Sequence, residues 1–235
     1  MDPATMNVSS ITADIAAVGA LGTAAFGLVD SFKALPGGGI SRSGFKFIRA
    51  AIEKLTPPVP SLDKTELSRD SILYTLQSQW INGVAMSNQI SIAKSLIKLR
   101  LTPATAPALA AATGVNAALL AQVAAKIEAG NSAGFTPQET DAYGRFDLLL
   151  NTLLDQAYQR ADQRYKNAAR AMAVPVAVVL AVVGAYLVFG GQHFTGGDLA
   201  VAILAGLIST PIAPVAKDIA SAVSTAAQAF QVGKK

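Results

Sequence analysis

The longest uncharged stretch of the chain, residues 171–197, constrains the fold more than any other feature. Its 27 residues include no Asp, Glu, Lys or Arg, and residues 171–189 are almost entirely apolar. The hydrocarbon core of a bilayer is about 30 Å thick, and roughly 20 helical residues cross it. We therefore predict a transmembrane helix at 171–190.

A second uncharged segment, residues 199–216, follows closely and is long enough to cross a membrane nearly upright. The residues between, 191–198, are predicted to form a turn that closes a helical hairpin. Pro211 and Pro214 each remove one backbone donor from this span, which favours a simple kink. The alternative interpretation is a cation site at the carbonyl groups freed around 208–210, as in the broken helices of transporters.

A third span is predicted near the N-terminus, at 11–32, after a short tail at 1–10. Residues 15–29 are uncharged and lie between Asp14 and Asp30, which a helix separates by roughly 24 Å. No Lys or Arg precedes this segment, so we interpret it as a retained helix and not as a cleaved signal peptide. Only 14% of all residues are charged, against about 25% in soluble domains, which also favours a membrane protein.

The positions of the basic residues predict one topology. Sixteen of the 19 Lys and Arg residues lie between Lys33 and Arg170, and the other three follow the last span. Because cytoplasmic loops are enriched in Lys and Arg, we expect the N-terminus and the 191–198 turn outside and the C-terminus in the cytoplasm. The expected fold is an all-α integral membrane protein with three transmembrane helices and a helical cytoplasmic domain inserted between the first and second. The expected location is the bacterial inner membrane.

Residues 33–60 are predicted to form an amphipathic helix followed by a linker, which ends in the helix-breaking sequence TPPVP. Phe45, Ile48, Ile52 and Leu55 share one face of the helix. Two interpretations stay open. The helix lies on the membrane surface with Arg42, Lys46 and Arg49 on anionic headgroups, or its apolar face packs on the rest of the middle domain.

Residues 61–170 are predicted to form a helical cytoplasmic domain with a stalk. We expect one helical segment from 61 to about 100, then two short helices on either side of Gly114. Thr136 and Glu139 form a capping-box pattern around Pro137, which marks a helix start. No proline follows before Pro175, so this helix is expected to continue to 189, about 80 Å in all.

Several residues of this long helix recur at heptad-like spacing, which is typical of a coiled coil. They are Leu150, Leu154, Ala157, Ala161, Tyr165, Ala168 and Met172. After the last span, residues 217–235 are predicted to form a cytoplasmic amphipathic tail, with Ile219, Val223, Ala226 and Phe230 on one side.

Each span carries a stripe of small side chains, the pattern through which membrane helices approach one another closely. The stripes are Ala16, Ala20, Thr23 and Gly27; Ala173, Ala177, Ala181 and Ala185; and Ala202, Gly206, Ser209, Ala213, Ala216 and Ala220. Together with the heptad pattern they favour a homo-oligomer. No charged residue lies deep in a span, so coupling through buried carboxylates is not expected.

In such an oligomer, the residues expected to line a pore or to form the kink are Thr23, Ser209, Thr210, Pro211 and Pro214. His193, the only histidine, lies among four glycines in residues 190–197, together with Gln192, Phe194 and Thr195. A plain turn in water is the simpler interpretation. In a ring of subunits His193 would instead form an outer mouth whose charge changes between about pH 5 and 8.

Other classes of function are disfavoured. The chain has no cysteine and one histidine, and we find no catalytic constellation, no cofactor and no metal site. Residues 37–46 have Phe45 directly after the last glycine, where a phosphate loop has its lysine. Residues 109–123 have the spacing of a helix-turn-helix but almost no cations, so nucleic acid is not an expected partner. We expect an oligomeric pore of weak selectivity, gated through the cytoplasmic domain. The alternative is a membrane-anchored scaffold that recruits a cytoplasmic protein.

Overall fold

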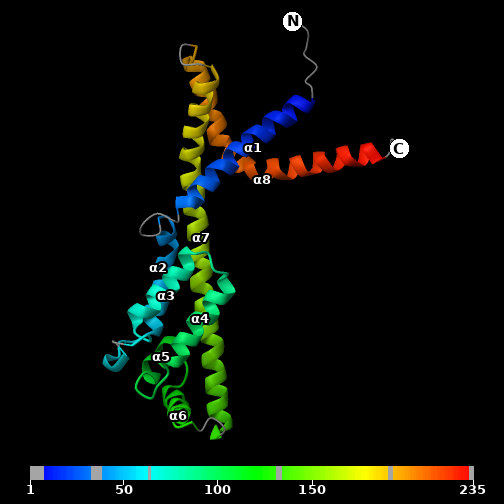
Figure 1. The fold of residues 1–235 in the computed structure, drawn as a ribbon. Coiled ribbons are helices and arrows are strands. Elements are labelled where there is room, and N and C mark those ends of the chain that lie inside the picture. The colour runs from blue at the N-terminus through cyan, green and yellow to red at the C-terminus, as the bar shows by residue number, and fades with distance from the viewer. Residues whose placement is uncertain (1–7, 33–38, 63–64, 131–133, 190–192, 233–235) are drawn as a thin grey trace. The chain divides into compact units, whose positions relative to one another are not determined.

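The computed structural model describes the backbone of residues 8–32, 39–62, 65–130, 134–189 and 193–232, with side chains described between 13 and 214 in these ranges, Ser61 excepted. Every regular element in them is a helix, as predicted (Figure 1). The elements are α1 (Val8–Ser31), α2 (Ser41–Leu55), the 3-10 helix η2 (Pro60–Leu62), α3 (Arg69–Ile81), α4 (Met86–Leu99), α5 (Ala106–Thr113), α6 (Ala117–Glu128), α7 (Pro137–Phe189) and α8 (Gly196–Val232).

The chain divides into two compact units. We call Met1–Leu35 with Lys166–Lys235 the apolar unit, and Pro36–Tyr165 the helical domain. The helix α7 contributes its first part to the helical domain and its second part to the apolar unit.

Three helices are long and apolar enough to cross a membrane: Ala13–Ser31 of α1, α7, and Gly196–Pro214 of α8. The predicted unbroken helix from Pro137 to Phe189 is confirmed. Its 53 residues measure about 80 Å at 1.5 Å per residue, so only part of α7 can lie within a hydrocarbon core of about 30 Å.

The predicted capping box at the start of α7 is also confirmed. The backbone N–H of Glu139 donates to Thr136 Oγ1 at 3.2 Å, and the backbone N–H of Thr136 donates to Glu139 Oε2 at 2.6 Å. The Lys126 ammonium group lies 2.6 Å from the same carboxylate oxygen. The hydrogen bond from Lys126, followed by the one from the Thr136 backbone, holds the pKa of Glu139 below its usual value. These contacts join the end of α6 to the start of α7.

The core of the helical domain is formed by buried side chains of α2, α3, α4, α5 and α6 and of the first part of α7. The apolar face predicted for α2 is buried in this core, with Ile48 and Ile52 fully buried and Phe45 4% exposed. This burial favours the packed interpretation of α2, in which the apolar face is covered by protein.

The helix α2 approaches α7 closely at Gly44. A Cβ atom at this position would lie 2.5 Å from the backbone oxygen of Ala161 and 2.9 Å from Trp80 Cζ2. The indole N–H of Trp80 donates to the backbone oxygen of Ser41 at 3.0 Å. Glycine is required here because no other residue leaves the two backbones free to meet.

The heptad-like residues of α7 are used inside the chain. Leu150, Leu154 and Ala161 are fully buried in the core of the helical domain. Of the remaining four, Ala157 is buried, Tyr165 and Ala168 are partly buried, and Met172 is exposed. This part of the pattern therefore no longer argues for a second copy of the chain.

Arg100 is a large buried residue that the sequence pattern does not reveal, and it is only 1% exposed. Its guanidinium group donates to the backbone oxygens of Leu67 and Pro57, which precede it by 33 and 43 residues. A buried cation is tolerated when its donors find such acceptors. Arg100 thereby fixes the connection between α2 and α3 to the end of α4.

Two predicted boundaries differ from the structure. The helix expected from 61 to about 100 is two helices, α3 and α4. The first ends at Ile81, and Gly83 after it adopts a left-handed backbone with φ of 67°, which a helix cannot continue. The span expected at 199–216 is not separated from the tail, since α8 continues to Val232 through both prolines. Figure 1 shows α8 changing direction between its orange and red parts, consistent with the predicted kink at Pro211 and Pro214. The tail's side chains after Pro214 lie outside the described ones.

Candidate functional sites

The helices of the apolar unit meet through small residues. A Cβ atom on Gly22 of α1 would lie 2.7 Å from the backbone carbon of Ser209 and 3.0 Å from Ala213 Cβ, both on α8. A Cβ atom on Gly206 of α8 would lie 2.5 Å from Val178 Cα on α7. The predicted stripe on α8 is the contact face as far as Ala213, since Ala202, Gly206, Ser209 and Ala213 are all buried. Its last two members, Ala216 and Ala220, lie outside the described side chains.

The stripe predicted on α1 is not its contact face. Ala16, Ala20, Thr23 and Gly27 are all exposed, while Gly19, Gly22, Ala25 and Val29 are buried. Both faces of α1 carry small residues. The close packing of Gly22 on the α8 backbone selects one of them.

The structure separates the hydroxyl residues predicted to line a pore. Ser209 is fully buried and Thr210 is 7% exposed, and the Ser209 hydroxyl donates to the Gly206 backbone oxygen at 2.8 Å. Thr23 is exposed, and its hydroxyl donates to the Gly19 backbone oxygen at 2.9 Å. Thr23 and Ser209 therefore do not share one surface of the chain. Pro211 and Pro214 are exposed.

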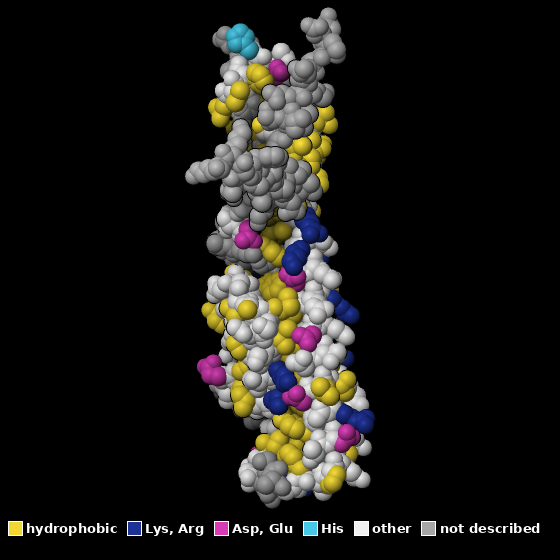
Figure 2. All heavy atoms as spheres, turned by 90° about the vertical axis from the view of Figure 1, so that its right-hand side faces the viewer, with side chains coloured by type: hydrophobic (Ala, Val, Ile, Leu, Met, Phe, Trp, Pro, Cys, Tyr) yellow, Lys and Arg dark blue, Asp and Glu magenta, His cyan; other side chains and the backbone are white. Residues whose placement is uncertain are grey.

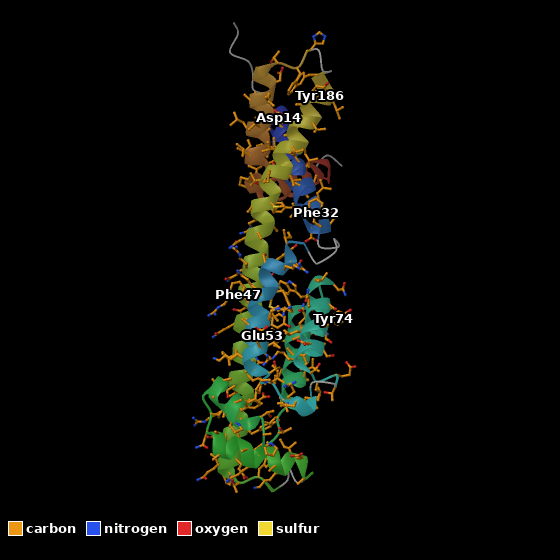
Figure 3. The ribbon with its side chains drawn as sticks, turned by 90° about the vertical axis from the view of Figure 1, so that its left-hand side faces the viewer. Asp14, Phe32, Phe47, Glu53, Tyr74 and Tyr186 are labelled. Carbon is orange, nitrogen blue, oxygen red and sulfur yellow. The ribbon has the colours of Figure 1, made fainter. Side chains whose placement is uncertain are left out.

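Two contacts stabilise the turn before α8, one between Tyr186 and Phe194 and one between Thr195 and Asp198. The Tyr186 ring, labelled in Figure 3, meets the Phe194 ring edge-on at 5.9 Å between centroids. Thr195 and Asp198 form a second capping box, in which the Thr195 backbone N–H donates to Asp198 Oδ2 at 2.9 Å. His193 is exposed, as a turn residue is expected to be. Gly190, Gly191 and Gln192 lie outside the described residues.

A hollow of about 420 Å³ lies among α1, α7 and α8 in the apolar unit. Its lining includes Leu21, Gly184 and Ala205, and its other lining residues are apolar as well, with the exception of Asp198 at one end. Such a lining suits hydrocarbon better than water or ions.

The helical domain carries a groove of about 230 Å³ between α2 and α7, which the sequence analysis missed. Small side chains make the hollow, since Ala50 and Ala51 of α2 face Ala157 of α7 across it. The other residues that line the groove are Phe47, Lys54, Leu55, Leu153, Gln156 and Arg160. Figure 3 labels Phe47 on α2.

The two cations of this groove, Lys54 and Arg160, differ from Lys94 and Lys98 of the same domain in their ion pairing. Lys94 and Lys98 bind Asp147 at 2.7 and 3.0 Å. Burial alone raises the pKa of Asp147, but these two hydrogen bonds outweigh burial and hold the pKa below its usual value. Lys54 and Arg160 are exposed, and neither forms an ion pair or hydrogen bond with any residue the structure describes. Lys54 and Arg160 are more than 100 residues apart in the sequence, so the sequence does not reveal that both line one groove.

The cations predicted to lie on a membrane surface, Arg42, Lys46 and Arg49, are all exposed on α2. The Lys46 ammonium group lies 5.3 Å from the centroid of the Phe47 ring, and Arg49 lies 3.9 Å from Glu53. In the face drawn in Figure 2, dark-blue basic side chains alternate with magenta acidic ones over the helical domain. Contact of these three residues with headgroups stays a prediction.

These features define a class, an all-helical protein with three apolar helices of membrane-spanning length and a helical domain inserted after the first. In comparisons with known proteins, no family model, no curated protein and no solved structure matches the chain.

Proposed function

We propose that this protein is a membrane-anchored scaffold that recruits a cytoplasmic partner through its helical domain. The observation that carries this proposal is the groove between α2 and α7, which leaves apolar surface beside Lys54 and Arg160, two cations that pair with no residue the structure describes. Close packing of the helices through small residues in the apolar unit suits an anchor. The expected host membrane is the bacterial inner membrane, with the helical domain in the cytoplasm.

An oligomeric pore is the second candidate. It is favoured by the exposed stripe of Ala16, Ala20, Thr23 and Gly27, which leaves a face of α1 for a second copy. A pore between copies is lined by residues that each copy exposes. Ser209 and Thr210 are buried, so they are poor lining residues, and Thr23 is the remaining hydroxyl candidate among them. We therefore rank the scaffold first.

A flux measurement separates the two candidates. The full-length protein in liposomes is expected to release potassium no faster than protein-free liposomes, because an anchor provides no polar path across the hydrocarbon. Flux that Thr23→Leu removes and Ala24→Leu leaves unchanged would favour the pore. Both positions are exposed on α1, so the two substitutions add similar apolar volume to neighbouring surfaces.

The proposed orientation is tested by single cysteines, which the natural chain lacks. His193→Cys and Tyr74→Cys place the thiol at exposed positions, Tyr74 being 75% exposed. A membrane-impermeant maleimide added to intact cells is expected to label the cysteine at 193 and not the one at 74, because basic segments stay in the cytoplasm. Permeabilised cells, the control, should show labelling at both. Labelling at 74 in intact cells would place the helical domain outside.

A further inference from the structure

From the groove we infer the chemistry of the partner, an inference that depends on the proposed scaffold function. We propose that the groove between α2 and α7 binds an acidic amphipathic helix of another protein. An apolar anchor of that helix enters the hollow between Ala50, Ala51 and Ala157, and carboxylates on either side of the anchor meet Lys54 and Arg160.

The size of the groove suits a side chain of this kind. A cavity of about 150 Å³ is enough to hold a benzene-sized group. The groove, at about 230 Å³, has room for one aromatic or branched aliphatic side chain and part of a neighbour. Because Phe47 and Leu153 are only partly buried, the entering side chain removes further apolar surface from water.

Neither the chain's two terminal segments nor residues 33–38 supply an acidic helix for the groove. Residues 215–235 contain Lys217, Lys234 and Lys235 against the single acid Asp218, and residues 33–38 contain a lysine and no acid. Residues 1–7 contain one acid, Asp2, but precede the first span. A basic tail is repelled by Lys54 and Arg160, which favours a separate partner.

A helix is the expected form of the bound segment. The groove lies between two helices, and the described part of the helical domain has no strand edge to which an extended peptide could add. An amphipathic helix that places its apolar face in a hydrophobic groove needs no backbone partner, because its backbone hydrogen bonds are already made.

Site-specific photo-cross-linking in intact cells tests this inference with the full-length chain. Benzoylphenylalanine replaces Ala50, an exposed alanine of the groove. The expected adduct joins Ala50 to a protein segment with apolar residues at helical spacing and flanking Asp or Glu. Lys54→Glu and Arg160→Glu together should lower the yield of this adduct about fivefold or more, since charge reversal replaces attraction by repulsion.

The matched control is Arg145→Glu, an exposed residue on the same helix, whose pairing with Asp141 at 2.9 Å is an exposed pair of small energetic value. It should leave the adduct unchanged. A synthetic peptide of the cross-linked segment should bind the natural protein, and the same peptide with Lys for its acids should bind only the doubly reversed variant.

The outcomes distinguish this inference from the proposed function. A partner that co-isolates in full with the doubly reversed variant, or an adduct that contains no acidic helix, overturns the inference and leaves the scaffold proposal intact. An adduct with lipid or with a second copy of this chain also overturns it. If potassium flux appears and no partner joins the helical domain, both proposals fail.

Discussion

Replacing Gly44 by leucine is expected to lower the thermal unfolding midpoint of the helical domain by about 10 °C. Even the first carbon of the new side chain would lie 2.5 Å from the Ala161 backbone oxygen, so α2 and α7 must separate. Overpacking of this kind costs about 3 kcal/mol, which corresponds to roughly 10 °C in a domain of this size. Trp80 is the only tryptophan and lies at this contact, so its fluorescence follows the loss of packing directly.

The matched control for this variant is Gly144→Leu. Gly144 is exposed on α7, and a Cβ atom there would have no neighbour within 4 Å. Because leucine has a higher helix propensity than glycine, by roughly 0.5–1 kcal/mol, this substitution should leave the midpoint unchanged or raise it slightly. If Gly44→Leu melts like Gly144→Leu, with Trp80 emission unshifted, α2 does not approach α7 at this position.

Much of the helical domain was predictable because a helix in contact with water has an apolar buried face and a charged exposed face. The face of Phe45, Ile48, Ile52 and Leu55 stands out against the charged remainder of α2, and this helix lies within the segment 33–60 for which an amphipathic helix and a linker were predicted. The start of α7 was predictable from local chemistry alone, since Thr136 and Glu139 satisfy each other's backbone groups. A sequence pattern within one or two turns of a helix can be recognised without knowing the tertiary structure.

The contact face of α1 was not predictable for the opposite reason. A helix in lipid is apolar on every side, so hydrophobic periodicity does not separate a packed face from an exposed one. Small residues occur on two faces, at Ala16, Ala20, Thr23 and Gly27 and at Gly19, Gly22 and Ala25. Only the backbone approach of α8 to Gly22 decides between them.

The groove was not predicted because its lining residues come from two segments, one near the beginning and one near the end of the domain's sequence. Three alanines make a hollow only when α2 and α7 lie side by side, and an alanine in a helix carries no sequence signal of its own. Likewise Arg100 looks like an ordinary cation until its backbone acceptors, at Pro57 and Leu67, are brought to it by the fold. Such sites depend on which segments of the chain come into contact. The periodicity of apolar residues in the sequence does not give this information.

Gly22→Leu is expected to open the contact between α1 and α8 in the apolar unit. The Cβ atom alone would lie 2.7 Å from the Ser209 backbone carbon, and a backbone cannot move aside as a flexible side chain does. A cost of about 1–3 kcal/mol increases the population of separated helices by roughly 5- to 150-fold. In a bilayer, burial of apolar side chains would not compensate for this cost, because lipid tails are as apolar as the side chains themselves.

The opening is measured through a cysteine at Ala25, a fully buried position of α1 in a chain without natural cysteine. In detergent micelles this cysteine should react with a maleimide about tenfold faster or more when Gly22→Leu is added. Gly27→Leu is the control on the same helix, since Gly27 is exposed and a Cβ atom there has no neighbour within 4 Å. Equal rates for the two variants would mean that α1 meets α8 through another face, and the exposed stripe with Thr23 would then be the first face to test.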